Sequence, residues 1–422
     1  MSMSATSSLI RRTVATAWGD VAYLESGQGP PALFIHGVFL SADLWRAQLA
    51  ALSDLRRCVA VDLLAHGASP LPRSAELTIG EQADMVLAFI EALDEEQFDV
   101  VANDSGGAIA QIVAVRAPHR IRTLTLTNCD AHDNWPPADF QPIQDMARAG
   151  LLADGLMAAA ADPSIARAAL NDALESPDAI PDTFLSAVFG PFADSVRARA
   201  VESWVAGMES SPTVAIHDDL ARLRTPTLIA WGTADDFFDR SWAQWLSDAI
   251  PGTVDVVEVP GGKLLWPLEH PEILVAHLRD LWTNTANYAL LARYLDAWNR
   301  HDLDSVTDLH SEDTVFTLHV GGLPSHTGRD AVRRAFENDL ANWPDAHWEP
   351  RRRSVTSDRC ILEANFTATA AAALDANGAI LPAGSSLESA CVDILEIRNG
   401  RISRKDTYLD ALGLLSHAEA ST

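Results

Sequence analysis

The chain is poor in basic residues and in cysteine. Its 422 residues include 31 Lys and Arg against 58 Asp and Glu, which gives a formal net charge of −27 at pH 7. This acidic balance argues against nucleic acid or an anionic membrane surface as a partner. The four cysteines, Cys58, Cys129, Cys360 and Cys391, lie far apart and form no Cys-x-x-Cys pair. They are typical of buried free thiols in a reducing cytoplasm, which is the location we predict.

Long apolar runs are also missing. No run approaches the roughly 18 residues that span a bilayer, and no apolar segment of the kind found in signal peptides follows Arg11-Arg12. Glycine-rich nucleotide-binding motifs and clusters with metal-ligand spacing are absent as well. We therefore expect no membrane span, no cofactor and no metal. With 48% hydrophobic residues the chain can still build a sizeable core.

Short apolar runs alternate with helical patterns over the first two thirds of the chain. A hairpin around Gly19-Asp20 is followed by runs near 32–35, 57–61, 98–103, 122–128, 227–231 and 253–259. Strands that alternate with helices predict a mostly parallel sheet covered on both faces. The Ala-rich, helical interval from about 134 to 222 breaks this alternation. It predicts a helical lid over a site.

A different pattern begins after residue 283. A short polar stretch, Thr283-Asn-Thr-Ala-Asn, reads as a linker. Helical patterns follow at 288–299, 303–309 and 331–342, with strands near 315–320, 350–356, 360–370, 388–397 and 401–410 and a hairpin turn at Asn399-Gly400. Helices followed by antiparallel strands predict a separate α+β domain. The expected division is a first domain over 1–283, a linker over 284–288 and a second domain over 289–415.

Residues 100–107 carry the clearest chemical signal. They read Val-Val-Ala-Asn-Asp-Ser-Gly-Gly and lead directly into a helical run. A buried strand that turns sharply into a helix is typical of a nucleophile elbow, which exposes one reactive side chain. The small residues that such a turn needs, Gly106 and Gly107, place Asp104 rather than Ser105 at its apex. An Asp nucleophile forms an ester with its substrate, so a second step driven by a base must hydrolyse that ester.

Residues 1–283 resemble the α/β-hydrolase superfamily. The motifs that carry the resemblance are the elbow, His36-Gly37, Asp62-Leu-Leu-Ala-His-Gly-Ala-Ser and Trp231-Gly-Thr-Ala-Asp-Asp. An Asp nucleophile makes the chain similar to haloalkane dehalogenases, fluoroacetate dehalogenases and epoxide hydrolases. The resemblance implies that the backbone N–H groups of Val38 and Ser105 form an oxyanion hole. It also implies that Asp235 is the catalytic acid, with Asp130 as a second candidate.

The chain departs from each of these subfamilies. Ser105 replaces the Trp or Arg that follows the nucleophile in the dehalogenases, and Val38 replaces a halide-holding Asn. None of the four tyrosines lies in the lid, where epoxide hydrolases place their proton donors.

The largest departure concerns the base. Lys263 stands where the family has its catalytic His. An amine acts as a base only if its pKa is lowered by several units, so the alternative is a salt-bridged loop lysine, paired with Asp235. His270 follows seven residues later, where a helix-capping role is the other reading, and His132 is a further candidate for a displaced base.

Residues 288–415 resemble the SnoaL-like polyketide cyclases of the cone-shaped NTF2-like fold. The motifs are Ala297-Trp-Asn-Arg-His-Asp-Leu-Asp, Thr327-Gly-Arg-Asp-Ala-Val, Trp343-Pro-Asp and the stretch from Ile397 to Gly413. The resemblance implies an apolar pocket with an inward carboxylate that moves a proton next to a carbonyl.

Strand periodicity puts Arg404, Asp406, Tyr408 and Asp410 on one face. If that face lines the pocket, Asp406 is the base and Tyr408 an enolate-stabilising donor, with Asp393 and His319 on neighbouring strands. The alternatives are an exposed Arg404–Asp406 pair, a domain that only binds a small molecule, or a homodimer formed through this domain.

Together these features predict an α/β-hydrolase fold with a helical lid, followed by a SnoaL-like α+β domain. We expect a hydrolase that attacks an apolar small-molecule electrophile, of epoxide, halide or ester type, through an Asp104 ester. One alternative is an isomerase, cyclase or lyase that uses Asp104, Asp406 or both as a general base. The other is a catalytically silent hydrolase fold.

Overall fold

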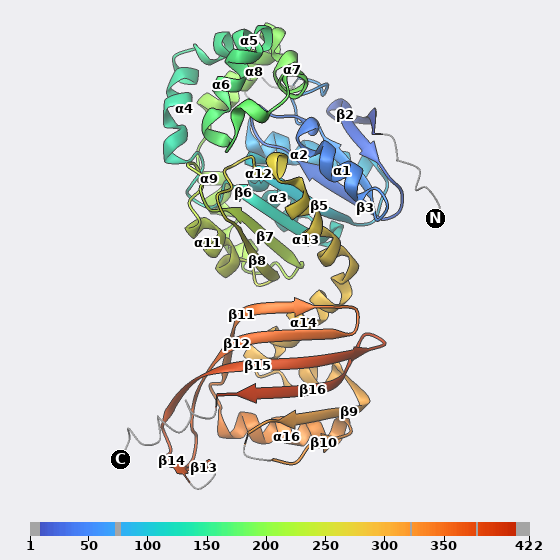
Figure 1. The fold of residues 1–422 in the computed structure, drawn as a ribbon, viewed down its shortest axis with the longest axis vertical. Coiled ribbons are helices and arrows are strands. Elements are labelled where there is room, and N and C mark those ends of the chain that lie inside the picture. Colours follow the sequence, from blue (N-terminus) through green and yellow to red (C-terminus); the bar gives the residue numbers. More distant parts are fainter. Residues whose placement is uncertain (1–8, 72–76, 321–322, 377–378, 411–422) are drawn as a thin grey trace. The chain divides into compact units, whose positions relative to one another are not determined.

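The computed structural model describes residues 9–71, 77–320, 323–376 and 379–410 (Figure 1). The chain divides into two compact units, Met1–Trp282 and Thr283–Thr422, and each is described by itself. Among the described residues, no helix combines the length and the apolar character that a membrane span needs. The four cysteines are buried and free.

The first unit is built on an eight-stranded sheet with the order β1-β2-β4-β3-β5-β6-β7-β8. The pairs β1–β2 and β2–β4 are antiparallel, and the remaining pairs are parallel. The central strands are continuous apolar runs because both faces of the sheet are covered. The strands are β1 (Ile10–Thr16), β2 (Gly19–Ser26), β3 (Pro31–Ile35), β4 (Arg57–Val61), β5 (Phe98–Asp104), β6 (Ile121–Cys129), β7 (Thr227–Gly232) and β8 (Thr253–Val259).

The helices of this unit form two groups. One group packs on the sheet: α1 (Arg46–Leu52), α2 (Ile79–Ala92), α3 (Ser105–Arg116), α11 (Ser241–Ala249), α12 (Trp266–Glu269) and α13 (Pro271–Thr283). Helix α2 begins at a capping box in which Thr78 and Glu81 satisfy each other's backbone N–H groups. The other group lies between β6 and β7, as the sequence predicts: α4 (Gln141–Arg148), α5 (Leu152–Ala161), α6 (Pro163–Ala169), α7 (Asp182–Phe189), α8 (Ser195–Ala206), α9 (Ser211–Ala215) and α10 (His217–Leu220). We call residues 134–222 the lid; its helices are drawn in green in Figure 1.

The second unit is an α+β structure with a six-stranded sheet in the order β10-β9-β16-β15-β12-β11. Strands β16 and β9 are parallel and the other pairs are antiparallel. Its strands are β9 (His310–Leu318), β10 (His326–Thr327), β11 (His347–Val355), β12 (Arg359–Thr369), β15 (Ser386–Arg398) and β16 (Arg401–Leu409), with a separate pair, β13 (Leu374–Ala376) and β14 (Ala379–Leu381). Asn399 and Gly400 both have positive φ, which confirms the predicted hairpin turn.

The helices of the second unit are α14 (Thr285–Asn299), α15 (Leu303–Asp308) and α16 (Arg329–Asn342). The expected linker is wrong in one respect, because residues 285–288 are the first turn of α14. Polar composition suggested an irregular segment, but Asn287 is buried and donates a hydrogen bond to the Thr356 carbonyl at 2.7 Å. Tertiary packing therefore outweighs the weak helix propensity of these residues.

Candidate active site

Asp104 occupies the apex of a strained turn. It is the last residue of β5 and the N-cap of α3, with φ 57° and ψ −140°. A non-glycine residue in this region costs about 1–3 kcal/mol and persists only where its surroundings enforce it. The two following glycines are part of that enforcement: a Cβ on Gly106 would lie 2.5 Å from the His36 carbonyl oxygen, and one on Gly107 would lie 2.2 Å from the Cys129 Cβ. The strained residue is Asp104, and Ser105 is already helical.

The loop after β3 brings backbone donors to the Asp104 carboxylate. Gly37 packs so closely that a Cβ there would lie 1.9 Å from the Asp104 Oδ2. The backbone N–H groups of Ser105 and Val38 both interact with this carboxylate and lower its pKa. The Val38 N–H also donates to the Ser105 Oγ at 2.7 Å. The two predicted oxyanion-hole amides thus lie beside Asp104, and the Ser105 hydroxyl shares one of them.

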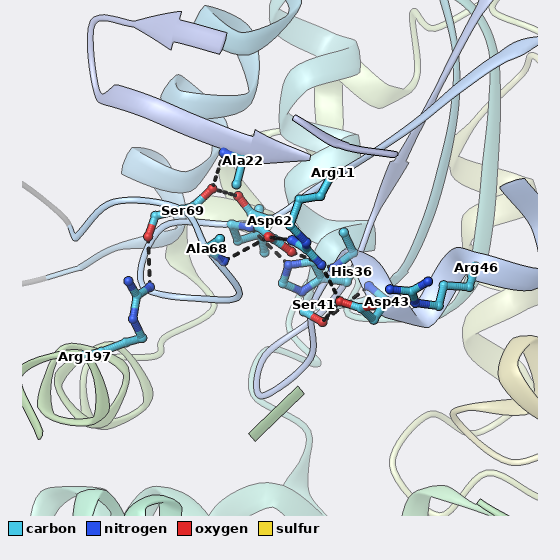
Figure 2. Close-up of polar contacts among 12 residues, drawn as sticks. Arg11, Ala22, His36, Ser41, Asp43, Arg46, Asp62, Ala68, Ser69 and Arg197 are labelled. Carbon is cyan, nitrogen blue, oxygen red and sulfur yellow. Dashed lines mark hydrogen bonds and ion pairs between the residues drawn. The ribbon is translucent and has the colours of Figure 1, made fainter. Parts of the chain in front are cut away.

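A polar network holds this loop in place (Figure 2). Asp62, at the end of β4, accepts hydrogen bonds from Ala42 N at 2.8 Å and from Ala68 N at 3.0 Å, and it pairs with Arg11. His36 accepts from Leu63 N at 3.0 Å through Nε2, and its Nδ1 lies 2.7 Å from the Gly37 carbonyl oxygen. Burial lowers the pKa of His36 to about 4. A neutral His36 therefore positions the loop, which leaves it no role as a base.

Three carboxyl groups converge near the carboxyl ends of β5, β6 and β7. Burial raises the pKa of Asp104 to about 7. The hydrogen bond from the Ser105 amide opposes this increase, and the charge of Asp235 adds to it. Burial and the Asp104 charge raise the pKa of Asp130 well above its usual range. Burial also raises the pKa of Asp235 to about 6. Burial and the neighbouring negative charges thus both favour the protonated form, above all at Asp130.

The partners of these carboxyl groups differ. Asp235 accepts from Asn128 Nδ2 at 2.7 Å and from Phe237 N at 2.9 Å. Asn128 is itself fixed by Trp266, whose indole N–H donates to its Oδ1 at 2.9 Å. By contrast, the Asp130 Oδ1 is buried without a hydrogen-bond partner among the described residues. Our sequence reasoning did not include Asn128, although a polar residue at the end of a buried strand is a usable signal.

A small apolar cavity of about 60 Å³ lies between these carboxyl groups and the lid. Asp104 and Asp130 are its only titratable lining residues in the described part of the chain. Its walls come from the oxyanion loop, the lid and the segments after β7 and β8: Val38, Phe39, Leu40, Trp135, Pro136, Pro137, Phe140, Ile143, Ala169, Leu170, Ala173, Met208, Phe237, Phe238, Leu264 and Leu265. An apolar lining around two carboxyl groups suits a small, uncharged substrate.

Lys263 does not meet the requirement for a base. Its Nζ pairs with the Asp236 carboxylate at 2.8 Å, and this hydrogen bond raises the pKa of the amine. The loop-lysine alternative fits better, but the partner is Asp236 and not Asp235 as expected. His270 lies at the start of α13, half exposed, with its Nε2 3.1 Å from a Glu175 oxygen. The ring of His132 stacks on Trp245 with centroids 4.8 Å apart and does not line the cavity.

This placement gives a first prediction. Replacing Lys263 by Gln should leave the rate of the reaction at Asp104 almost unchanged, because the ammonium lies in a surface ion pair. Steady-state kinetics of the purified variant would check this. A loss of about 10²-fold or more, the size expected for a general base, would instead place Lys263 in the chemistry.

The expected role of Asp406 required its face of the sheet to line the pocket, and the structure does not meet this condition. A cavity in the second unit is lined by the row Lys405, Thr407 and Leu409 of β16. Asp406 and Tyr408 belong to the opposite row, so neither lines that cavity. Alternation along a strand defines two faces but not which of them the helices cover.

The residues of the outer row instead make an ion-pair cluster. Asp406 accepts from Arg404 Nε at 2.5 Å and lies 2.8 Å from His319 Nε2, while the His319 ring stacks on Tyr408. Burial tends to raise the pKa of Asp406, but the hydrogen bonds from Arg404 and His319 outweigh it and lower that pKa. Asp410 is exposed at the end of the strand. A carboxylate stabilised in this way is a weak base. Across the described residues, no group of three or more His, Cys, Asp or Glu side chains is arranged to hold a metal ion.

Comparison with protein families gives two matches. A model described as "alpha/beta hydrolase fold" matches residues 30–265, and one described as "SnoaL-like domain" matches residues 291–405. Two curated relatives are haloalkane dehalogenase 2 of Mycobacterium bovis, 36% identical over 110 residues (26% of this chain), and 2-hydroxymuconate semialdehyde hydrolase of Pseudomonas sp. strain CF600, 36% identical over 105 residues (24% of this chain). The aligned segments span only 38% and 37% of these relatives' lengths.

Solved structures confirm the fold of the first unit. The crystal structure of haloalkane dehalogenase DbeA from Bradyrhizobium elkani USDA94 aligns with 66% of this chain and 98% of its own, at 21% sequence identity and a TM-score of 0.52. At this identity the likeness concerns the fold alone.

Proposed function

Because the chain belongs to the alpha/beta hydrolase fold family, we propose that its first unit hydrolyses a small apolar epoxide through a covalent ester on Asp104. The observation that carries the proposal is the position of Asp104. Asp104 lies at a strained apex beside two backbone N–H donors, and it lines an apolar cavity. We favour an epoxide over a halide because its leaving oxygen needs a proton, and the Asp130 carboxyl, which lines the same cavity and has an unpaired Oδ1 among the described residues, supports this choice.

The first step uses the two carboxyl groups in opposite protonation states. An ionised Asp104 oxygen forms a bond to an epoxide carbon while the ring C–O bond breaks. The Asp130 carboxyl gives its proton to the released oxygen. Burial favours a protonated Asp130, while the Val38 and Ser105 amides favour an ionised Asp104. The step ends with a neutral ester on Asp104 and a carboxylate at Asp130.

The second step regenerates Asp104. Asp130 takes a proton from water as the water oxygen adds to the ester carbonyl carbon, and the Val38 and Ser105 amides stabilise the oxyanion. Collapse breaks the ester C–O bond, and the departing alkoxide takes the proton from Asp130. Asp104 is left protonated, and transfer of that proton to Asp130 restores the starting state. Asp130 thereby does the work that the family assigns to an imidazole.

Replacing Asp130 by Asn tests this scheme with two probes. With styrene oxide, which needs a proton on its leaving oxygen, the variant should lose at least about 10²-fold in rate and form no adduct. With 1-bromobutane, whose bromide leaves without a proton, the variant should accumulate a butyl ester on Asp104 that intact-mass spectrometry detects. Asp133→Asn is the matched control, since Asp133 is exposed three residues away.

The two halves of the proposal fail separately in this experiment. Wild-type rates in Asp130→Asn would remove Asp130 from the mechanism but leave the ester possible. If no adduct forms with either probe and a single turnover in H₂¹⁸O places no enzyme oxygen in the product, the ester itself is excluded.

One observation favours a second function, a proton transfer without hydrolysis. A carboxyl with a pKa of about 7 is well matched to general acid–base work at neutral pH. In that isomerase or lyase reaction Asp104 removes a proton from carbon, and the product gains no oxygen. The same ¹⁸O experiment distinguishes the two functions, because only hydrolysis incorporates oxygen from Asp104 and then from the solvent.

A further inference from the structure

The second unit contains a larger cavity, of about 290 Å³, which we call the C-terminal cavity. Its walls are mainly aromatic and aliphatic, with rings from α14, β9, α16 and its C-cap, β11 and β12: Trp298, Phe316, Phe336, Trp343, Trp348 and Phe366. Neighbouring rings are in contact, with centroids 5.0 Å apart for Trp348–Phe366 and 4.8 Å for Trp298–Phe336. Such a surface offers several ring faces to a flat or cationic ligand.

Two acceptor side chains of α16 line this cavity without partners. Asp339 and Asn342 lie three residues apart, so they share one face of the helix. Within the described parts of the chain, neither side chain has a hydrogen-bond or ion-pair partner. A carboxylate against an apolar wall is costly to leave unpaired. A ligand that donates hydrogen bonds or carries positive charge would relieve that cost.

The positively charged side chain that lines the cavity, Lys405, already has a partner. Lys405 is buried and pairs with Asp393, and its Nζ lies 5.3 Å from the Tyr294 ring centroid and 5.6 Å from that of Trp298. Asp393 also accepts from the Thr407 hydroxyl at 2.5 Å. An anionic ligand would have to displace Asp393 from Lys405 and would face Asp339. A cationic ligand meets neither obstacle, because the Lys405–Asp393 pair is neutral as a unit.

We propose that the C-terminal cavity binds an organic ammonium ion that carries a flat apolar ring system. Asp339 pairs with the positive charge, and the Asn342 Oδ1 accepts a hydrogen bond from any N–H group that the ligand carries. The aromatic walls cover the ring system and the charged head. This inference does not depend on the reaction at Asp104. The acidic net charge of −27 adds a long-range attraction for cations.

The charge of Asp339 makes binding pH-dependent. Burial raises the pKa of Asp339 to about 6, and Lys405 opposes this shift. Of the other titratable groups around the cavity, burial lowers the pKa of His310 to about 3 and raises that of Tyr294 to about 12, so neither changes charge between pH 5 and 7. His326 stacks on Phe316 and does not line the cavity. A permanently charged ligand should therefore bind about tenfold more tightly at pH 7 than at pH 5.

Two arginines of the same helix make ion pairs outside the cavity. Arg333 pairs with Asp304 of α15 at 2.6 Å and with Glu337 at 3.2 Å, and Arg329 pairs with Glu312 of β9 at 3.0 Å. These pairs do not line the cavity. They supply a matched control, since Glu337→Gln removes one negative charge from the same helix outside the site.

Calorimetric titration of the full chain with (1-naphthylmethyl)trimethylammonium tests the proposal. Asp339→Asn should weaken binding at pH 7.5 by at least about tenfold and abolish the pH dependence, whereas Glu337→Gln should bind like the wild type. The anion 1-naphthaleneacetate should bind more weakly than the ammonium. Equal or tighter binding of the anion, unchanged affinity in Asp339→Asn, or a wild-type affinity that does not change between pH 5 and 7 would each overturn the proposal. The wild-type pH series needs no variant, so it remains decisive if Asp339→Asn does not fold.

Discussion

Replacing Asp104 by Asn should lower kcat/KM by about 10⁴-fold or more and abolish the covalent adduct. The amide keeps the shape of the side chain but supplies neither a nucleophilic oxygen nor a base. Steady-state kinetics with styrene oxide, together with intact-mass spectrometry after 1-bromobutane treatment, would measure both losses. Asp236→Asn is the matched control, because Asp236 is an exposed carboxylate in the Lys263 ion pair. Residual activity above about one per cent would show that another group carries the reaction.

The same substitution should stabilise the fold. Burial raises the pKa of Asp104 from 3.8 to about 7, so between these values the folded state binds more protons than the unfolded state. Stability contributed by this group therefore falls as pH rises through that window and stays low above it. Because Asn carries no charge, the variant does not lose this stability as pH rises. The Tm of Asp104→Asn should exceed that of the wild type by a margin that grows from pH 4 to pH 7. A lower Tm at pH 7 would mean that the carboxylate holds the turn together.

Local patterns in the sequence predicted most of the fold. The order of apolar runs, the interruption at 134–222 and the glycines after Asp104 are short-range signals, and each follows from a steric or burial requirement of its own neighbourhood. The elbow is the clearest case. A Cβ at position 106 would clash with the backbone at the end of β3, and one at position 107 would clash with the side chain of Cys129. The two glycines therefore indicate where the turn lies.

The side-chain arrangement was harder to predict, because it depends on contacts between distant segments. Lys263 follows β8, yet its partner, Asp236, lies in the loop after β7, one residue from the carboxylate we expected. On β16 the alternation of residues was predicted correctly, but the inward row contains Lys405 rather than Asp406. Strand alternation alone left open which row faces the pocket, and a buried lysine is rare enough that Lys405 gave no signal for the inward row. Only the position of Asp393 on the adjacent strand explains why the charge is tolerated there.

The Lys405–Asp393 pair leads to the second large effect that we expect. Replacing Lys405 by Met should destabilise the second unit by about 3–5 kcal/mol, because it leaves a buried Asp393 without its counter-charge. Although burial alone lowers the pKa of this amine, the attraction of Asp393 outweighs it and raises that pKa above its usual value. Urea unfolding of the full chain, followed through tryptophan fluorescence, would measure the loss as a lower midpoint of one transition.

The double variant Lys405→Met/Asp393→Leu separates the two possible causes. If the loss comes from the unpaired charge, removing Asp393 as well should restore most of the stability, since a buried ion pair is often replaceable by apolar residues of similar size. The Thr407 hydroxyl would then lose its acceptor, at a cost of about 1 kcal/mol. If the double variant is no more stable than Lys405→Met, the lysine acts through its packing against Tyr294 and Trp298. In that case the Lys405–Asp393 pair cannot be treated as a neutral unit. The positive charge of Lys405, which acts on Asp339, would then weaken the binding of an ammonium ion in the C-terminal cavity.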